Sequence, residues 1–201
     1  MKIKDLFGFN YKNQKPFIMI EIDYTIEELD LSYQGLTKLP EDLIKYRNLE
    51  ILSCRGNKLT KLDNLPIGLI SLDCSGNQLS QLDNLPIGLT ELYCSNNQII
   101  HLDNLPLTLK VLNCRHNQIT HLDNLPINLK ELNCGYNKLT KLDYLPISLT
   151  ILYCSYNQIS HLDNLPIGLI SLYCSGNKIK SLDSLPNSIT SFMCSNKSFG
   201  L

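Results

Sequence analysis

The sequence lacks an excess of charge of either sign. Its 18 lysine and arginine residues are offset by 19 aspartate and glutamate residues, which leaves a formal net charge of −1. Proteins that bind nucleic acid or anionic membrane surfaces owe much of their affinity to a field of positive charge. We therefore expect neither a nucleic acid nor a membrane among the partners.

Long apolar runs are also missing. A membrane-spanning helix needs about 18 or more apolar residues in succession, and no stretch of the sequence approaches that length. Lys2 and Lys4 are not followed by the apolar core of about 7–15 residues that a secretory signal contains. We expect a cytoplasmic protein, acting in a host cell if its source is an intracellular bacterium or a virus.

Repetition is what the sequence has in abundance. A unit of twenty residues, exemplified by 69–88, recurs from about Leu49 to the end of the chain. Its period is marked by Cys54, Cys74, Cys94, Cys114, Cys134, Cys154, Cys174 and Cys194, and again by Pro66, Pro86, Pro106, Pro126, Pro146, Pro166 and Pro186. A fixed period of this length predicts a solenoid, in which each unit forms one coil stacked on the next.

Within each unit, the segment around the cysteine predicts a short strand. Leu72 and Cys74 alternate with Ser71, Asp73 and Ser75, and such alternation is typical of a strand with one buried face. The cysteines should point inward. Asn77 and its equivalents stand where the strand ends, and an amide there can satisfy backbone groups that the bend leaves unpaired.

The rest of the unit returns the chain to the next strand. Proline excludes helix at its own position and favours extended backbone before it. We therefore expect a convex side that is extended or polyproline-like, with little helix. The first connection, 41–48, carries three extra residues and allows a short helical turn.

We divide the chain into an N-terminal cap segment, 1–27, and a solenoid, 28–201, whose first repeat is 23 residues long. A terminal coil exposes an apolar face, so solenoids need caps. The last coil should act as its own cap. The capping candidates are Ile18, Ile20, Ile22 and Ile26 at the start and Phe192 and Phe199 at the end.

The cysteines are predicted to be reduced. Equivalent positions on adjacent coils lie about 4.8 Å apart with parallel side chains, whereas a disulfide needs converging Cβ atoms about 3.5–4.5 Å apart. We infer buried thiols in a reducing compartment. The alternative is a metal-binding or thiol-buffering protein that uses the cysteine ladder or the histidine ladder of His101, His121 and His161, although a straight ladder cannot converge four thiols on one zinc ion.

The pattern L-x-x-L-x-C-x-x-N-x-L resembles the leucine-rich repeat signature, with cysteine in the third leucine position. The twenty-residue length and the L-x-x-L-P ending are similar to the short class of bacterial type III secreted effectors. Over about 29–201, the resemblance implies an α/β-class solenoid whose curved parallel sheet binds proteins on its concave side. Members of that class often have a second proline where this chain has aspartates such as Asp63. Some append a ubiquitin-ligase domain, but this sequence stops at Leu201, so no such activity is carried over.

The inward columns hardly vary between coils, whereas the outward strand columns vary freely and gather tyrosine and arginine, which are typical interface anchors. The predicted protein-binding residues are Tyr93, Asn113, Arg115, His116, Asn133, Tyr136, Tyr153, Tyr156 and Tyr173. The alternative is that strands favour aromatic residues in any case. Serine, histidine and aspartate recur in every coil, while catalysis needs a unique site. We therefore predict a monomeric, non-catalytic interaction module with a protein partner and no cofactor.

Overall fold

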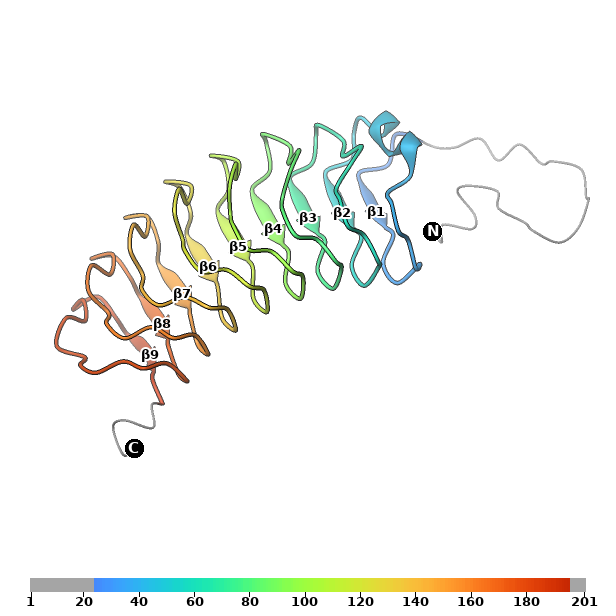
Figure 1. Cartoon of the computed structure of the whole chain (residues 1–201). Coiled ribbons are helices and arrows are strands. Elements are labelled where there is room, and N and C mark those ends of the chain that lie inside the picture. The colour runs from blue at the N-terminus through green and yellow to red at the C-terminus, as the bar shows by residue number, and fades with distance from the viewer. Residues whose placement is uncertain (1–23, 196–201) are drawn as a thin grey trace, which may run out of the picture.

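The computed structural model describes residues 24–195, which form a gently curved stack of coils (Figure 1). Across this range, nine short strands lie side by side in one sheet, in chain order. They are β1 Glu28–Asp30, β2 Ile51–Ser53, β3 Ser71–Asp73, β4 Glu91–Tyr93, β5 Val111–Asn113, β6 Glu131–Asn133, β7 Ile151–Tyr153, β8 Ser171–Tyr173 and β9 Ser191–Met193. Every neighbouring pair is parallel. The predicted solenoid with a curved parallel sheet on its concave side is confirmed.

The register aligns equivalent residues of successive coils. The middle residue of each strand points into the core, as Leu72, Leu112 and Leu152 do, and each is fully buried. The cysteine that follows each strand is buried as well, from Cys54 to Cys174, and Cys194 is half-buried. All eight cysteines are free thiols, which confirms the inward, unbridged cysteine ladder.

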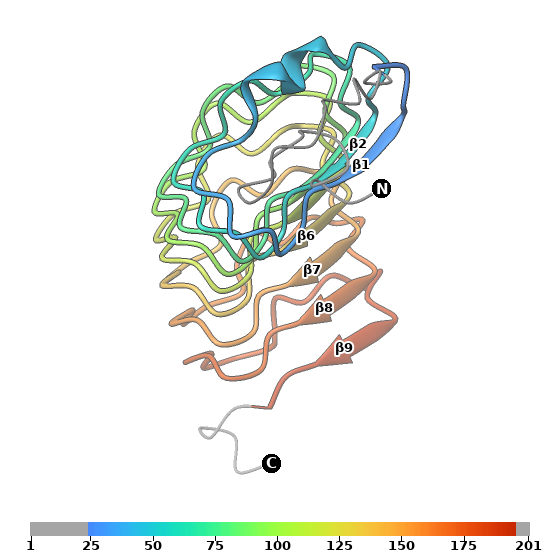
Figure 2. The same cartoon turned by 90° about the vertical axis from the view of Figure 1, so that its right-hand side faces the viewer.

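The returning side of each coil contains little helix, as predicted, and runs through turns on its way to the next strand. Figure 2 shows the strands on one side of the solenoid and the returning segments on the other. Within residues 24–195, helix is confined to the 3-10 helix η1, Glu41–Lys45, which occupies the longer first connection. Tyr46 follows η1 and its side chain is buried in the core. The centroid of its ring lies 5.0 Å from that of Tyr24.

A ladder of asparagines closes the coils against one another. The Asn77 Nδ2 group donates to the carbonyl oxygens of Cys54 (3.0 Å) and Cys74 (2.9 Å). Its Oδ1 atom accepts from the backbone N–H of Leu59 in the preceding coil (3.0 Å). The pattern is repeated by Asn97, Asn117, Asn137, Asn157 and Asn177. The expected role of the asparagine column is therefore borne out.

Two columns of residues adopt left-handed backbone. One follows the strands and contains Tyr33, Gly56, Gly76, Asn96, His116, Tyr136, Tyr156 and Gly176. The other lies on the returning side and contains Asn64, Asn84, Asn104, Asn124, Tyr144 and Asn164. Asparagine and glycine tolerate this conformation better than other residues. It explains the recurring asparagine of the L-D-N-L-P segment. Tyr144 departs from asparagine but keeps the left-handed backbone, with φ of 60°, whereas Ser184 in the last coil departs from both.

Replacing Tyr144 with asparagine should raise the free energy of unfolding by about 0.5–1 kcal/mol, because asparagine pays less for left-handed backbone. The Tyr144 side chain is 78% exposed, so little packing is lost. Denaturant unfolding measures the effect. The matched control is Asn124→Tyr, one coil earlier in the same column, which should lower stability by a similar amount. A neutral or destabilising Tyr144→Asn would contradict this account of the column.

The caps remain predictions. Ile18, Ile20, Ile22 and Phe199 lie outside the described residues, and Ile26 packs partly against the core. In the last coil, Phe192 takes the inward column opposite Leu172 but is 41% exposed. Residues 24–195 contain no helix with the length and hydropathy that a membrane crossing requires.

Candidate functional site

The first aromatic ladder lies on the strands. Tyr153 on β7 and Tyr173 on β8 are direct partners in the sheet register, and both flank inward leucines, so their rings stand on the concave face. The rings stack with centroids 4.7 Å apart and planes at 14°. The Tyr173 hydroxyl forms a 2.9 Å hydrogen bond with Ser191 Oγ, which fixes the ring tip.

The second ladder lies just past the strands and consists of His116, Tyr136 and Tyr156. The prediction that this column belongs to the strands is wrong, because each strand is three residues long and the column occupies a left-handed turn. The rings still stack across coils, at 4.1 Å for His116–Tyr136 and 4.3 Å for Tyr136–Tyr156. The Arg115 guanidinium lies 4.5 Å from the centre of the Tyr136 ring.

The absence of a side chain at Gly176 makes room for the last ring of the second ladder. The Tyr156 ring leans over Gly176 in the next coil, where an added Cβ would lie 2.8 Å from Tyr156 Cδ1. Tyr33 leans over Gly56 in the same way at the other end of the solenoid. The left-handed column thus sends its aromatic rings along the solenoid axis, each onto the coil that follows.

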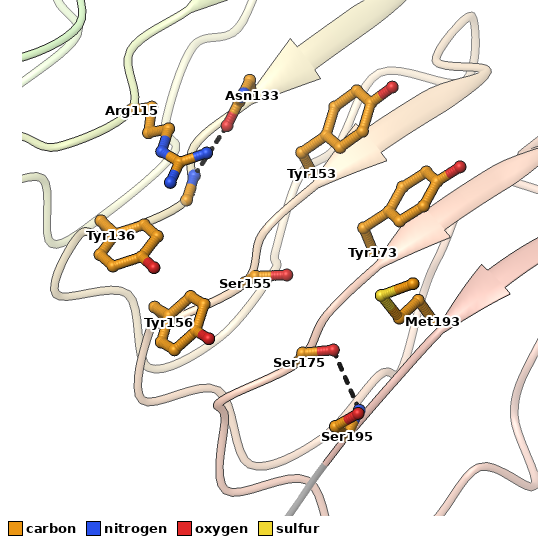
Figure 3. A pocket seen from close by; sticks show the side chains of 11 residues that line it. Arg115, Asn133, Tyr136, Tyr153, Ser155, Tyr156, Tyr173, Ser175, Met193 and Ser195 are labelled. Atoms are coloured by element: carbon orange, nitrogen blue, oxygen red, sulfur yellow. Dashed lines mark hydrogen bonds between the residues drawn. The ribbon is translucent and has the colours of Figure 1, made fainter.

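A groove of about 380 Å³ lies between the two ladders (Figure 3). Its walls are Tyr136 and Tyr156 on one side and Tyr153 and Tyr173 on the other. Its floor consists of small residues that follow the cysteines: Gly135, Ser155 and Ser175. Arg115 and Asn133 line one end, and Met193 and Ser195 line the other. Small floor residues give the groove its depth.

The polar groups of the groove are the Arg115 guanidinium, which only donates, the Asn133 amide, and tyrosine and serine hydroxyls, which can donate or accept. Arg115 supplies a permanent positive charge, and no acidic residue is found among the described residues that line the groove. Burial, followed by the charge of Glu131 and the Tyr173 phenol, raises the pKa of Tyr153, so its hydroxyl keeps its proton. Asn133 Oδ1 already accepts from the Gly135 N–H (3.2 Å). The groove therefore suits a ligand that offers acceptor oxygens.

Burial and the neighbouring Arg115 charge lower the pKa of His116. Its imidazole is therefore neutral at pH 7, which suits a ring stacked on Tyr136 beside a guanidinium. The histidine extends the second ladder without adding a second positive charge.

The structure brings most of the predicted residues together. Six of the nine line the groove, and His116 stacks on its edge. Tyr93 and Asn113 lie outside it: the Tyr93 hydroxyl donates to Glu91 (3.4 Å), and Asn113 Oδ1 accepts from the Arg115 N–H (3.2 Å). Sequence reasoning missed the floor and the Met193 end. The signal was present, since the residue after each cysteine is small in four successive coils, from Gly135 to Ser195.

The alternative metal site finds no support in the geometry. Within residues 24–195, no three histidine, cysteine, aspartate or glutamate side chains are grouped so that they could hold an ion. The Nδ1 atoms of His121 and His161 bond to the hydroxyls of Thr120 (2.8 Å) and Ser160 (2.9 Å). Of the aspartates in the L-D-N-L-P column, Asp83, Asp143 and Asp183 have a side-chain partner two residues upstream, such as the Ser181 hydroxyl that donates to Asp183 (2.6 Å).

Comparison with known proteins places this architecture in a family. No family model matches the sequence, and no curated protein matches it. Among solved structures, YopM from Yersinia enterocolitica WA-314 is 37% identical with a TM-score of 0.73, over 82% of this chain and 36% of that chain. A Shigella effector LRR domain is 32% identical with a TM-score of 0.67, over 78% of this chain and 71% of that domain.

A third similar structure shares the thiol column. The functional domain of InlJ from Listeria monocytogenes, described as including a cysteine ladder, is 36% identical with a TM-score of 0.74, over 84% of this chain and 39% of that one. This chain thus spans 36% of that YopM chain and 39% of that InlJ chain. The repeat length, the parallel sheet and these sequence identities all indicate the same family. The chain belongs to the leucine-rich repeat family, in the short-repeat class of the bacterial effectors.

Proposed function

We propose that this protein is a non-catalytic module that binds a protein partner on its concave face, with the groove between the two aromatic ladders at the centre. Its leucine-rich repeat neighbours support a protein-interaction module in general. The observation that favours this site is a groove walled by four tyrosines. Eight free thiols support action in a reducing compartment such as the cytoplasm.

Stacking prepares the tyrosines for binding. Each groove tyrosine is held by an adjacent ring, so little rotamer freedom remains to be lost when a partner binds. Tyrosine also offers a large contact area with a hydrogen-bonding tip, which is why it recurs at interface hot spots. A rigid tyrosine surface of this kind favours affinity over adaptability.

The partner that fits is an extended segment with an acidic side chain near one end. A backbone in the groove would place carbonyl oxygens against the tyrosine and serine hydroxyls, and a carboxylate would pair with Arg115. A charged pair of this kind is stronger than a neutral hydrogen bond. High salt should therefore weaken binding through the Arg115 contact.

The double substitution Tyr153→Ala with Tyr156→Ala tests the groove. Each truncation should cost about 2 kcal/mol or more of binding free energy, while the free energy of unfolding should fall by only about 1 kcal/mol per residue through lost stacking. Affinity is measured by calorimetry with a partner captured by the wild-type chain, and stability by thermal melting.

The matched control is Tyr33→Ala, in the same left-handed column at the far end of the solenoid and 70% exposed. It should leave the affinity unchanged. If the double variant binds a genuine partner as tightly as the wild type, the binding site lies on another face.

A further inference from the structure

A stripe of exposed aliphatic side chains runs along the turns that precede the strands. The residue after each repeat proline is aliphatic in six successive coils and is 67–80% exposed in each. We call this set the aliphatic stripe: Ile67, Ile87, Leu107, Ile127, Ile147 and Ile167. The corresponding residue of the last coil is Asn187, which ends it. No stripe member contributes to the core, so packing within the chain does not explain the column.

The turns that carry the stripe are held in register. Within one turn, the Leu89 N–H donates to the Pro86 carbonyl (3.1 Å). Between turns, Thr108 Oγ1 donates to the Ile87 carbonyl (2.8 Å) and Ser148 Oγ donates to the Ile127 carbonyl (2.6 Å). The stripe is therefore a rigid array that repeats once per coil.

The stripe is large for a free surface. Six aliphatic side chains exposed to this degree present roughly 600 Å² of apolar area, at about 100 Å² each. That area is at the upper end for the largest apolar patch on a typical monomer, about 300–600 Å², and approaches the roughly 800 Å² that each partner contributes to a standard interface. The stripe itself contains no charged or hydrogen-bonding side chain, so whatever covers it must be apolar too.

We propose that the stripe is covered by the stripe of a second copy of this chain. The stripe has one aliphatic side chain per coil, and a second copy of the chain presents the same side chains at the same spacing. All six positions of one stripe can therefore be paired with positions of the other. The proposal replaces the sequence-based expectation of a monomer.

The dimer would leave the groove open. Stripe residues such as Ile147 come before the strands, whereas groove residues such as Tyr153 and Tyr156 lie at the strand ends and just beyond them. Self-association and partner binding therefore use different parts of each coil. The inference does not depend on the proposed function, and the two can fail separately.

Sedimentation equilibrium of the full chain in reductant tests the proposal over a wide range of concentrations. The wild type should be a dimer in equilibrium with monomer. Ile127→Glu combined with Ile147→Glu should raise the dimer dissociation constant by about 100-fold or more, because unpaired carboxylates would be buried at the interface. The positions are exposed in the monomer, so thermal melting should show a folded variant.

The control is Ile44→Glu, an exposed aliphatic residue on η1 outside the stripe. It should leave the dimer intact. A wild type that stays monomeric at every concentration overturns the proposal, as does a dimer that the stripe variant does not weaken. A monomeric wild type that floats with neutral phosphatidylcholine vesicles, and a stripe variant that does not, would assign the stripe to lipid instead and likewise overturn it.

Discussion

Asn137→Ala is expected to lower the free energy of unfolding by about 3 kcal/mol. The side chain is buried, and its Oδ1 atom accepts from the Ile119 N–H of the preceding coil at 2.9 Å. Its Nδ2 group donates to the carbonyls of Cys114 and Cys134, both at 3.0 Å. Alanine would leave the Ile119 N–H in the core without its acceptor, and it would remove the two bonds to the cysteine carbonyls and a longer one to the Gly135 carbonyl (3.3 Å). The two carbonyls each keep one asparagine partner, from Asn117 and Asn157.

The exposed Asn187 supplies the control. Asn187→Ala removes an amide from the surface and should change stability by about 0.5 kcal/mol or less. Denaturant unfolding by circular dichroism measures both variants. Equal effects from Asn137→Ala and Asn187→Ala would mean that the asparagine ladder is not a principal link between coils.

The second large effect is a loss of stability in mild alkali. Burial raises the pKa of Cys54, Cys114 and Cys154 to about 12, and it raises the pKa of Cys74, Cys94, Cys134 and Cys174 as well. In the unfolded chain each thiol titrates near about 8.5. The folded protein therefore retains protons that the unfolded chain releases.

The sign and the window follow from those pKa values. Stability is full below about pH 8.5 and falls as the pH rises toward 12, by about 1.4 kcal/mol per pH unit for each thiol ionised only in the unfolded chain. With seven such thiols, a typical stability of about 5–15 kcal/mol would be exhausted within about two pH units above 8.5. Unfolding by urea at a series of pH values, in reductant, measures the slope.

Lysine and tyrosine also titrate in alkali, so a thiol-deficient variant is needed as a control. Cys74→Ala with Cys134→Ala should be less stable at pH 7 because of the cavities. Above pH 9, however, its slope should be shallower by about 1.4 kcal/mol per pH unit for each thiol removed. An unchanged slope would show that the cysteines do not determine the alkaline limit.

Much of the fold could be predicted because a repeat displays its own constraints. Positions that face the core, such as Leu72 and Cys74, cannot vary from coil to coil, so comparison of the coils with one another predicted the inward columns. The same comparison predicted the asparagine ladder and the helical first connection. Each is fixed within one coil or between adjacent coils, and none depends on a distant contact.

The candidate site was less predictable because its shape depends on backbone conformation. Alternation alone could not reveal that Tyr136 and Tyr156 lie in a left-handed turn, since tyrosine is uncommon there. Nor did it reveal that the small residues at Gly135 and Ser155 deepen the surface between two rows of rings. The exposure of Ile127 and its equivalents could not be predicted either, because isoleucine is usually a core residue.

The asparagine ladder also makes the length of this protein easy to vary. Each of its bonds joins a coil to itself or to an immediate neighbour. If one twenty-residue segment such as 87–106 were lost or duplicated, each asparagine amide would still meet a cysteine carbonyl and a backbone N–H at the equivalent positions of its new neighbour. A change of nineteen or twenty-one residues would break this register. Gene duplication can therefore lengthen the concave face one coil at a time, and the tyrosine groove can move along the solenoid without any compensating change in the core.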